Sequence, residues 1–441
     1  MLGVSTVSYD YAGIERCRSF CKWLRMVLSW NSIQPTLETW QWESADRCVT
    51  HAKNLGYKII LDIGDGFSSE VPLYNGSPFL PNGVGNQKYL KHLQDFVIAI
   101  TQRYGNLISI FQIEREVNQA FLTGLWGWRD FSLGGSWKDW GFVTEIITSL
   151  SVIIRNAGHK ITTQIHTDIH PNLNKSIKTP SWLDAITQWA PHLDFIGISA
   201  YPNYIRATPV YSIQNRIHQI QKITQKPIIV LETGYPVASG PQSQLRSHSF
   251  SNQRLYVEKN IMDCMKSGVH GYFYFSPHAG IGFSYSYTSQ DLYALEKLAL
   301  CMETGDIRYF YQILSNPGLS YVQNIFPNVL QSTERGFIMF DINNNPLPAT
   351  QFLMDIYSHM TSFTWNLRRG NNLLAFPIKP MLSTLELFKQ MNASVMIYVD
   401  SEGNFKNHTD RDGEFEVTPG IGYLFVIREA RTFTYWGTTW E

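Results

Sequence analysis

The chain has 441 residues, of which 44% are hydrophobic and 14% aromatic, a composition typical of a folded globular protein rather than a disordered one. Lys and Arg together number 36, as do Asp and Glu, so the net charge of zero gives no electrostatic footprint for nucleic acid or an anionic membrane. No run of 18 apolar residues occurs, and five scattered cysteines do not predict a disulfide framework. We therefore expect no nucleic-acid partner and no membrane span.

Short apolar runs recur along the chain, and amphipathic segments such as 44–56 and 87–105 lie between them. The runs cover residues 2–9, 23–30, 57–64, 107–114, 160–167, 193–201, 226–233 and 270–277. Eight strands alternating with helices predict a closed (β/α)8 TIM barrel. The alternative is a doubly wound open sheet, which would place a Gly-rich phosphate turn after the first strand, and "SYDYAGIERC" is not one.

In such a barrel the functional residues sit at the C-terminal ends of the strands. Strand 4 ends in "FQIEREVN", with Glu114 and Glu116, and strand 7 ends in "IVLETGYP", with Glu232. Two carboxylates across one cleft are what glycoside hydrolysis requires, one as proton donor and one as nucleophile. From position alone, glutamates that merely cap loops in water are an equally good interpretation. The other strand ends carry Tyr9, Asp10, Arg25, Trp30, Asp62, Asp65, His166, Asp168, His170, Tyr201, Phe275 and His278.

Five stretches in order resemble the clan A glycoside hydrolases, retaining enzymes built on (β/α)8 barrels. "QIEREVN" matches five of seven positions of the pattern Q-I-E-N-E-P-N, and "KPIIVLETGYP" resembles the strand that carries the nucleophile. Strands 2 to 3 of the family resemble the segment from "WLRMVLSW" to "YKIILDIG". Strand 6 resembles "LDFIGISAYP", and the segment after strand 8 resembles "ERGFIMFDINNNPLPATQFL". The likeness covers about residues 3–358 and implies a barrel domain over 1–358.

The resemblance implies a retaining β-glycosidase without cofactor or metal. Glu116 would be the acid/base and Glu232 the nucleophile, with Arg25 and Tyr201 hydrogen-bonded to Glu232 and keeping it ionised. Glu114 would support the site, on the side that strand alternation shares with Gln112 and Glu116. The expected substrate-binding residues are Arg25, Trp30, Asp62, Glu114, Arg115, His166, Tyr201, Tyr235, Trp126 and Trp128.

Arg115 departs from the family pattern, which has Asn there to contact the sugar 2-hydroxyl. A cation beside Glu116 should lower the pKa of a group that needs a raised one to act as an acid. An ion pair would neutralise Arg115, and Glu114 is the first candidate partner. Either the substrate lacks the usual 2-hydroxyl contact, or the barrel is inactive and serves as a carbohydrate-binding or structural surface protein.

Two further groups could serve the site. The loop after strand 4 holds Trp126, Trp128, Trp137 and Trp140, which could form platforms for sugar faces, although we expect at least one to pack onto the barrel. His166, Asp168 and His170 alternate along an extended segment and so share a face. We interpret them as a polar substrate-lining edge rather than a metal site, because no distant ligand motif stands out.

After residue 358 the pattern changes to short alternating strands and turns, which predicts a small all-β C-terminal domain over 362–441. It resembles a β-rich module of secreted bacterial proteins in "GNNLLAFPIKP" and "TPGIGYLFV". Asn372 and Leu424 stand where that pattern has Trp, so a packing or spacer role is expected rather than binding.

The segment 278–333 is long for a connection after a barrel strand and partly helical. We expect it to wall one side of the cleft, or to offer a surface for self-association. The partner that the resemblance implies is an oligo- or polysaccharide. It also implies an extracellular or cell-surface protein, but the N-terminus as given shows no signal peptide, so a cytoplasmic location stays open.

Overall fold

The computed structural model describes residues 1–6, 9–63, 70–118, 134–237, 248–277, 287–326, 328–330, 337–341, 343–400, 402–409, 411–412, 414 and 417–438. The chain divides into two compact units, the first comprising Met1–Ile261 and Val269–Thr350, the second Met262–Gly268 and Gln351–Glu441. Among the described helices, none combines the length and apolar character needed to cross a membrane.

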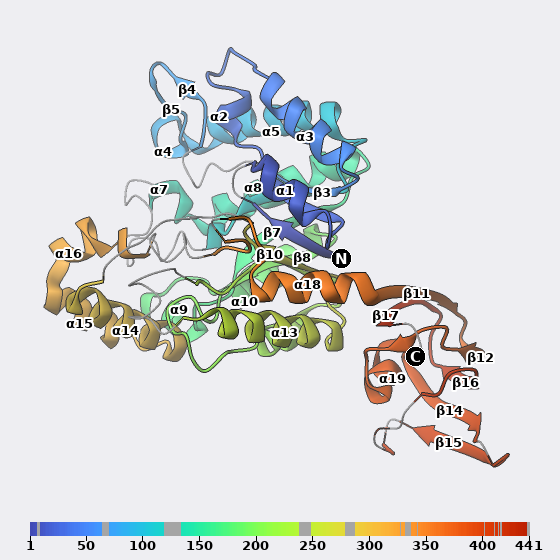
Figure 1. The fold of residues 1–441 in the computed structure, drawn as a ribbon. Coiled ribbons are helices and arrows are strands. Elements are labelled where there is room, and N and C mark those ends of the chain that lie inside the picture. Colours follow the sequence, from blue (N-terminus) through green and yellow to red (C-terminus); the bar gives the residue numbers. More distant parts are fainter. Residues whose placement is uncertain are drawn as a thin grey trace. The chain divides into compact units, whose positions relative to one another are not determined.

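The first unit is a closed barrel of parallel strands, so the predicted fold class is confirmed (Figure 1). Neighbouring strands follow the order β1-β10-β9-β8-β7-β6-β3-β2. Their bounds are β1 Leu2–Ser5, β2 Trp23–Val27, β3 Lys58–Ile63, β6 Ile110–Arg115, β7 Ile161–His166, β8 Ile196–Ala200, β9 Ile228–Thr233 and β10 Gly271–Phe275. Seven of these strands lie within the apolar runs and β6 ends one residue beyond its run, at Arg115. The runs mark the strands because strands covered on both faces are apolar throughout.

Helices follow the strands and surround the barrel (Figure 1). They are α1 Tyr11–Cys17, α2 Trp30–Ile33, α3 Glu43–Asn54, α4 Pro81–Val84, α5 Asn86–Tyr104, α7 Gly134–Trp137, α8 Trp140–Asn156, α9 Pro171–Ile177, α10 Trp182–Trp189, the 3-10 turn η4 Ala190–His192, α11 Gln214–Ile223 and α13 Phe250–Lys266. A two-strand ribbon pairs β4 Leu73–Tyr74 with β5 Ser77–Pro78. In α5, Leu90, Leu93, Val97 and Ile100 recur at helical spacing and are buried, which fixes the face turned to the barrel.

The barrel interior has an apolar layer and a polar one. Ile60, Ile110, Ile229, Leu231 and Phe273 form a buried cluster. Towards the C-terminal strand ends the interior residues become charged or polar, as described below. The apolar layer fills the barrel interior, so the polar layer is open only towards the C-terminal face.

Three helices and a π-turn fill much of the predicted insertion: α14 Ser289–Thr304, α15 Arg308–Ile313, η5 Leu314–Gly318 and α16 Leu319–Asn324. A capping box begins α14, in which Thr288 and Asp291 satisfy each other's backbone N–H groups. Leu295, Leu298 and Phe326 belong to a buried core, against which Tyr201 of the barrel packs. The insertion thus stands against strand ends on the C-terminal face of the barrel, as a wall would.

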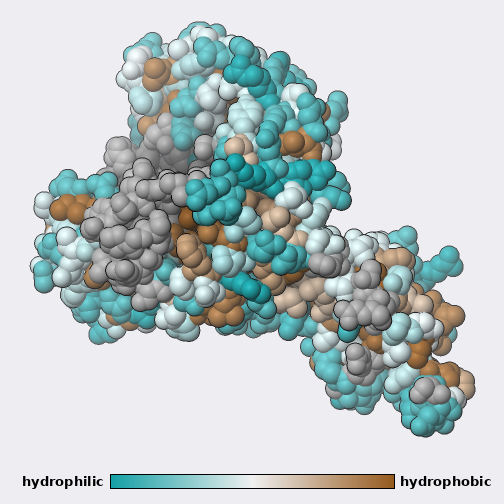
Figure 2. Space-filling model, viewed as in Figure 1, coloured by the Kyte–Doolittle hydropathy of each residue, from teal (hydrophilic) through white to brown (hydrophobic). Residues whose placement is uncertain are grey.

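The second unit contains two antiparallel sheets, ordered β11-β17-β13 and β12-β16-β14-β15. Its elements are most of α18 Pro348–His359, then β11 Met360–Leu367, β12 Gly370–Ala375, β13 Lys379–Pro380, α19 Thr384–Met391, β14 Ala393–Val399, β15 Phe405–Thr409, β16 Gly422–Ile427 and β17 Arg431–Thr438. Met396, Tyr423, Phe425 and Tyr435 lie in its buried core. Figure 2 shows hydrophobic residues on the surface of this unit too. Leu424 alternates with these buried residues along β16 and is half-buried, so it offers no exposed aromatic platform.

Candidate active site

Arg25 is fully buried and organises the centre of the barrel's C-terminal face. Its guanidinium donates to side-chain oxygens on β1, β3, β6, β7 and β9, namely Ser5 Oγ at 2.9 Å, Asp62 Oδ2 at 2.7 Å, Gln112 Oε1 at 2.6 Å, Gln164 Oε1 at 3.0 Å and Glu232 Oε1. A buried guanidinium is stable only when its fork of donors finds acceptors. The network therefore fixes Arg25 and orients everything bonded to it.

Glu232 reaches the interior because β9 contains a bulge. On β8 and β9, Ile198 pairs with Val230 but the next residue, Ser199, pairs with Glu232, so Leu231 is the extra residue. Arg25 donates to one oxygen of Glu232, and the Tyr201 hydroxyl donates to the other at 2.8 Å. These two donors hold the Glu232 carboxylate in one orientation.

Tyr201 is suited to remain a donor. Burial raises the pKa of Tyr201 well above its usual range, and the charges of Glu232 and Glu116 raise it further. Its hydroxyl is therefore protonated throughout the pH range in which proteins are folded and donates to Glu232.

Glu116 lies beyond a second bulge, at the end of β6. Gln112 pairs with Thr162 and Arg115 with Gln164, so three residues on β6 oppose two on β7 and the side-chain alternation shifts by one. The regular alternation by which Glu114 was expected to share a side with Gln112 is therefore interrupted at this bulge. Glu114 and Glu116 both have positive φ angles, 52° and 54°. Such backbone is uncommon outside glycine and clusters at functional sites.

The Glu116 carboxylate contacts β7 and β8. Its Oε1 accepts from the Ser199 hydroxyl and lies 3.2 Å from His166 Nδ1. Ser199 also pairs in register with His166 on one side and Glu232 on the other. One short residue on β8 therefore lies between the two candidate catalytic carboxylates and binds one of them.

His166 is held from several directions. Its backbone N–H and carbonyl exchange hydrogen bonds of 2.9 Å with the Asn118 side chain. Its Nε2 lies 3.8 Å from Asp168 Oδ2, and Asp168 is in turn paired with Arg216 at 2.9 Å. Burial lowers the pKa of His166, but the charge and hydrogen bond of Glu116 and the charge of Asp168 outweigh burial, so the pKa is raised overall.

Arg115 finds its carboxylate partner on β3. Its Nε lies 3.9 Å from Asp62 Oδ2, the oxygen that also accepts from Arg25. The sequence placed Glu114 first among candidate partners, and the structure adds Asp62 as a partner that the sequence did not suggest. Asp62 is fully buried, so its charge acts on both arginines with little screening.

The structure does not bring every expected residue to this site. Trp30 is fully buried among Phe79, Tyr89 and Phe96, and its indole N–H donates to Gln34, so it packs in the core and has no face for a sugar. Tyr235 is also fully buried, and its hydroxyl donates to the Ala207 carbonyl. Both were expected to bind substrate, and aromatic packing explains why they do not line the mouth.

The tryptophans of the loop after strand 4 fall into two groups, those that the structure describes and those that it does not. Trp126 and Trp128 lie outside the described residues, as do Asp65 and His278. Trp137 is buried against Tyr89 and Phe142, so the expectation that one tryptophan of this loop packs onto the barrel is confirmed. Within the part of the chain that the structure describes, no group of three or more His, Cys, Asp or Glu side chains is arranged to hold a metal ion.

Sequence reasoning missed Ser199, Asn118 and Gln164. Ser199 could have been found, because it stands two residues before Tyr201 on a strand and so faces the same way. Asn118 and Gln164 carry no such signal, since their roles depend on contacts between strands.

Residues 84–278 match the family model "Glycosyl hydrolase family 53", which covers less than half of the chain. A search of curated protein sequences finds no match. Among solved structures, the exo-β-1,4-mannosidase Op5Man5 from Opitutaceae bacterium strain TAV5 is 9% identical with a TM-score of 0.51. That match covers 81% of this chain but 59% of the mannosidase, so the chain spans less than two thirds of that enzyme.

Two further structures are similar over most of their length. A family 39 glycoside hydrolase from the gut symbiont Bacteroides cellulosilyticus WH2 is 13% identical, with a TM-score of 0.51 over 96% of this chain and 80% of that one. A GH10 endoxylanase from a sugarcane soil metagenome is 12% identical, with a TM-score of 0.52 over 80% of this chain and 96% of that one. At these identities the likeness shows the fold. With the family-model match, it confirms the resemblance to the clan A glycoside hydrolases.

Proposed function

We propose that the protein is a retaining glycoside hydrolase that cleaves a β-linked glycan with Glu232 as nucleophile and Glu116 as acid/base. The observation that carries the proposal is the arrangement around Ser199: it binds Glu116 through its hydroxyl and lies in register with Glu232, which Arg25 and Tyr201 hold. Two strand-end carboxylates are thereby presented to one interior face, as the double displacement needs.

In the first step a Glu232 oxygen attacks the anomeric carbon and forms a carbon–oxygen bond while the bond to the leaving oxygen breaks. Glu116 gives its proton to that oxygen, and a glycosyl ester on Glu232 results. In the second step Glu116 takes a proton from water, the water oxygen bonds to the anomeric carbon, and Glu232 leaves as carboxylate. Arg25 and Tyr201 orient Glu232 for both steps.

Direct tests are hydrolysis of a panel of β-linked glycans and Glu232→Gln, which keeps the shape and removes the nucleophile. We expect one glycan to be cleaved, and Glu232→Gln and Glu116→Gln to lower kcat/KM for it by about a thousandfold or more, roughly 4 kcal/mol of transition-state stabilisation. Hydrolysis that both variants retain would overturn the assignment.

A second candidate is the inactive barrel that binds glycans without cleaving them. The observations that favour it are Arg115 in the place of the family's Asn and the His166 imidazole at 3.2 Å from Glu116, since cations near Glu116 favour its carboxylate over the acid. Glycan binding by folded protein without hydrolysis, unchanged in Arg115→Asn, would support this candidate.

A further inference from the structure

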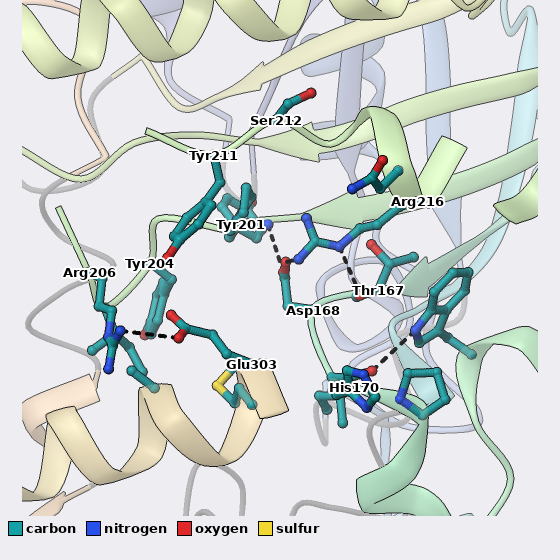
Figure 3. Close-up of a pocket in the computed structure, with 18 of the residues that line it drawn as sticks. Thr167, Asp168, His170, Tyr201, Tyr204, Arg206, Tyr211, Ser212, Arg216 and Glu303 are labelled. Atoms are coloured by element: carbon teal, nitrogen blue, oxygen red, sulfur yellow. Dashed lines mark hydrogen bonds and ion pairs between the residues drawn. The ribbon is translucent and has the colours of Figure 1, made fainter. Parts of the chain in front are cut away.

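A cavity lies beside the candidate active site, between the barrel and the insertion (Figure 3). It has a volume of about 380 Å³. Residues that follow β7 and β8, one face of α11, and α14 of the insertion line it, including His170, Tyr204, Arg206, Tyr211, Arg216 and Glu303. A pocket of this size accommodates a small organic ligand or one or two units of a polymer.

The charges of the lining cancel in pairs. Arg206 pairs at 3.2 Å with Glu303, which also lines the pocket, and at 2.6 Å with Glu296, which lies outside the lining. Arg216 pairs with Asp168 at 2.9 Å, on the opposite side of the view in Figure 3. His170 accepts the Asn172 N–H on Nδ1, at 3.2 Å. These pairings favour a neutral polar ligand over a phosphate or another anion.

The lining also combines fixed aromatic rings with polar groups that can bind a ligand. The backbone N–H of Tyr211 donates to Asn203 Oδ1 at 2.9 Å, and the Tyr204 hydroxyl donates to the Leu330 carbonyl at 2.8 Å. Gln219 presents an exposed amide. Arg206 Nε is buried and has no hydrogen-bond partner among the described residues. Rigid aromatic surface with donors and acceptors around it suits a hydroxyl-rich ring.

Tyr201 connects this pocket to the candidate active site. It lines the pocket, its backbone N–H donates to Asp168 Oδ2 at 2.6 Å, and its hydroxyl donates to Glu232 at 2.8 Å. One residue therefore lies between the nucleophile and the pocket. The pocket and the candidate active site therefore share Tyr201 as a common wall.

We propose that the pocket between α11, the β8–α11 loop and α14 is a binding site for a neutral sugar unit of the glycan, away from the bond that is cleaved. The proposal rests on the proposed function for the identity of the glycan. The insertion supplies one wall through α14, so it would make the protein prefer long glycans to short ones.

The test measures binding and hydrolysis with a disaccharide and a hexasaccharide of each β-glycan in the panel. Tyr211→Ala removes an aromatic ring from the lining, and Gln219→Ala removes an exposed amide whose loss cannot unfold the protein. Tyr311→Ala is the matched control, because Tyr311 is 53% exposed on α15 of the same insertion and lies outside the lining. Dissociation constants are measured in the Glu232→Gln background, which leaves the oligosaccharides intact.

We expect the Glu232→Gln protein, with its pocket unchanged, to bind the hexasaccharide more tightly than the disaccharide. Adding Tyr211→Ala should weaken hexasaccharide binding about tenfold, equivalent to about 1.4 kcal/mol. Gln219→Ala should weaken it less, and Tyr311→Ala not at all. Equal affinities for both lengths, or hexasaccharide binding that neither pocket variant changes, would overturn the proposal even if hydrolysis is observed. A different result would separate the two proposals: no hydrolysis by the wild type, together with tighter binding of the longer glycan that is lost in Tyr211→Ala. That result would overturn the proposed function but support the pocket.

Discussion

Arg25 is the residue on which the charge balance of the site depends, since it is fully buried and pairs with both Asp62 and Glu232. Arg25→Met would leave the buried carboxylates of Asp62 and Glu232 with too little positive charge beside them. We expect it to lower the free energy of unfolding of the barrel by about 3–5 kcal/mol, measured by denaturant titration, and to abolish hydrolysis. The matched control is Arg47→Met, whose pair with Glu43 is exposed and worth about 0.5 kcal/mol at most. Similar losses in both variants would contradict the importance of the buried network.

Arg115 tests whether the departure from the family pattern matters. Asp62 already has Arg25 as a partner, so Arg115→Asn does not leave it uncompensated. For a conventional glycan we expect kcat/KM to stay the same or rise, because the variant restores the sugar 2-hydroxyl contact. A loss of about tenfold or more, roughly 1.4 kcal/mol, would instead identify Arg115 as a substrate contact.

His166 should make stability depend on pH. Its pKa is raised in the folded protein, so its contribution is fully present below its unfolded pKa of about 6.5 and is lost as the pH rises through the higher folded value. We therefore expect His166→Gln to cost more unfolding free energy near about pH 5 than near about pH 9. His218→Gln, at an exposed position on α11, should change the unfolding free energy by less than about 0.5 kcal/mol. A cost of His166→Gln that is independent of pH would contradict the ion-pair account.

At this scale the sequence predicted that Glu116, Glu232, Arg25 and Tyr201 stand at or near strand ends, because strand ends and motif positions are local features. In the structure, Arg25 and Tyr201 both donate hydrogen bonds to Glu232, and His166 lies beside Glu116. The sequence could not identify Asp62 as a partner of Arg115, because Asp62 is far away in the chain. Trp30 and Tyr235 were misassigned because position at a strand end does not reveal whether an aromatic ring turns to the mouth or into the core.

At the scale of elements, the two bulges explain where periodicity fails. Apolar runs located all eight strands, since an interior strand must be apolar on both faces. A bulge inserts one residue without changing composition, so alternation along β6 and β9 could not predict which side chains turn inward. The shift occurs beside both candidate catalytic glutamates.

The insertion shares a buried core with residues that follow the barrel strands, and Leu298 on α14 is 2% exposed within it. Leu298→Ala should leave a cavity and cost about 2–5 kcal/mol of unfolding free energy. Leu319→Ala on α16, where the side chain is 56% exposed, should cost less than about 0.5 kcal/mol. Equal effects would show that the helices of the insertion do not pack around Leu298.

At the scale of the whole molecule, the division into two compact units predicts separate unfolding transitions. Met396 is fully buried in the core of the second unit. Met396→Ala should lower the Tm of one calorimetric transition and leave the other, together with glycan hydrolysis, unchanged. A single transition that shifts as a whole would mean that the units unfold together.

The account's central claim is double displacement by Glu232 with Glu116 as acid/base, and the anomeric configuration of the first sugar released tests it most directly. Proton NMR during hydrolysis of a β-linked glycan distinguishes the β product from the α product before they interconvert. We predict the β product, because formation of a glycosyl ester on Glu232 inverts the anomeric carbon once and attack by water inverts it again. This mechanism requires the two carboxyl groups to lie about 5–5.5 Å apart. An α product first would contradict the account, since single displacement needs the carboxyl groups about 6.5–9.5 Å apart and makes no ester on Glu232.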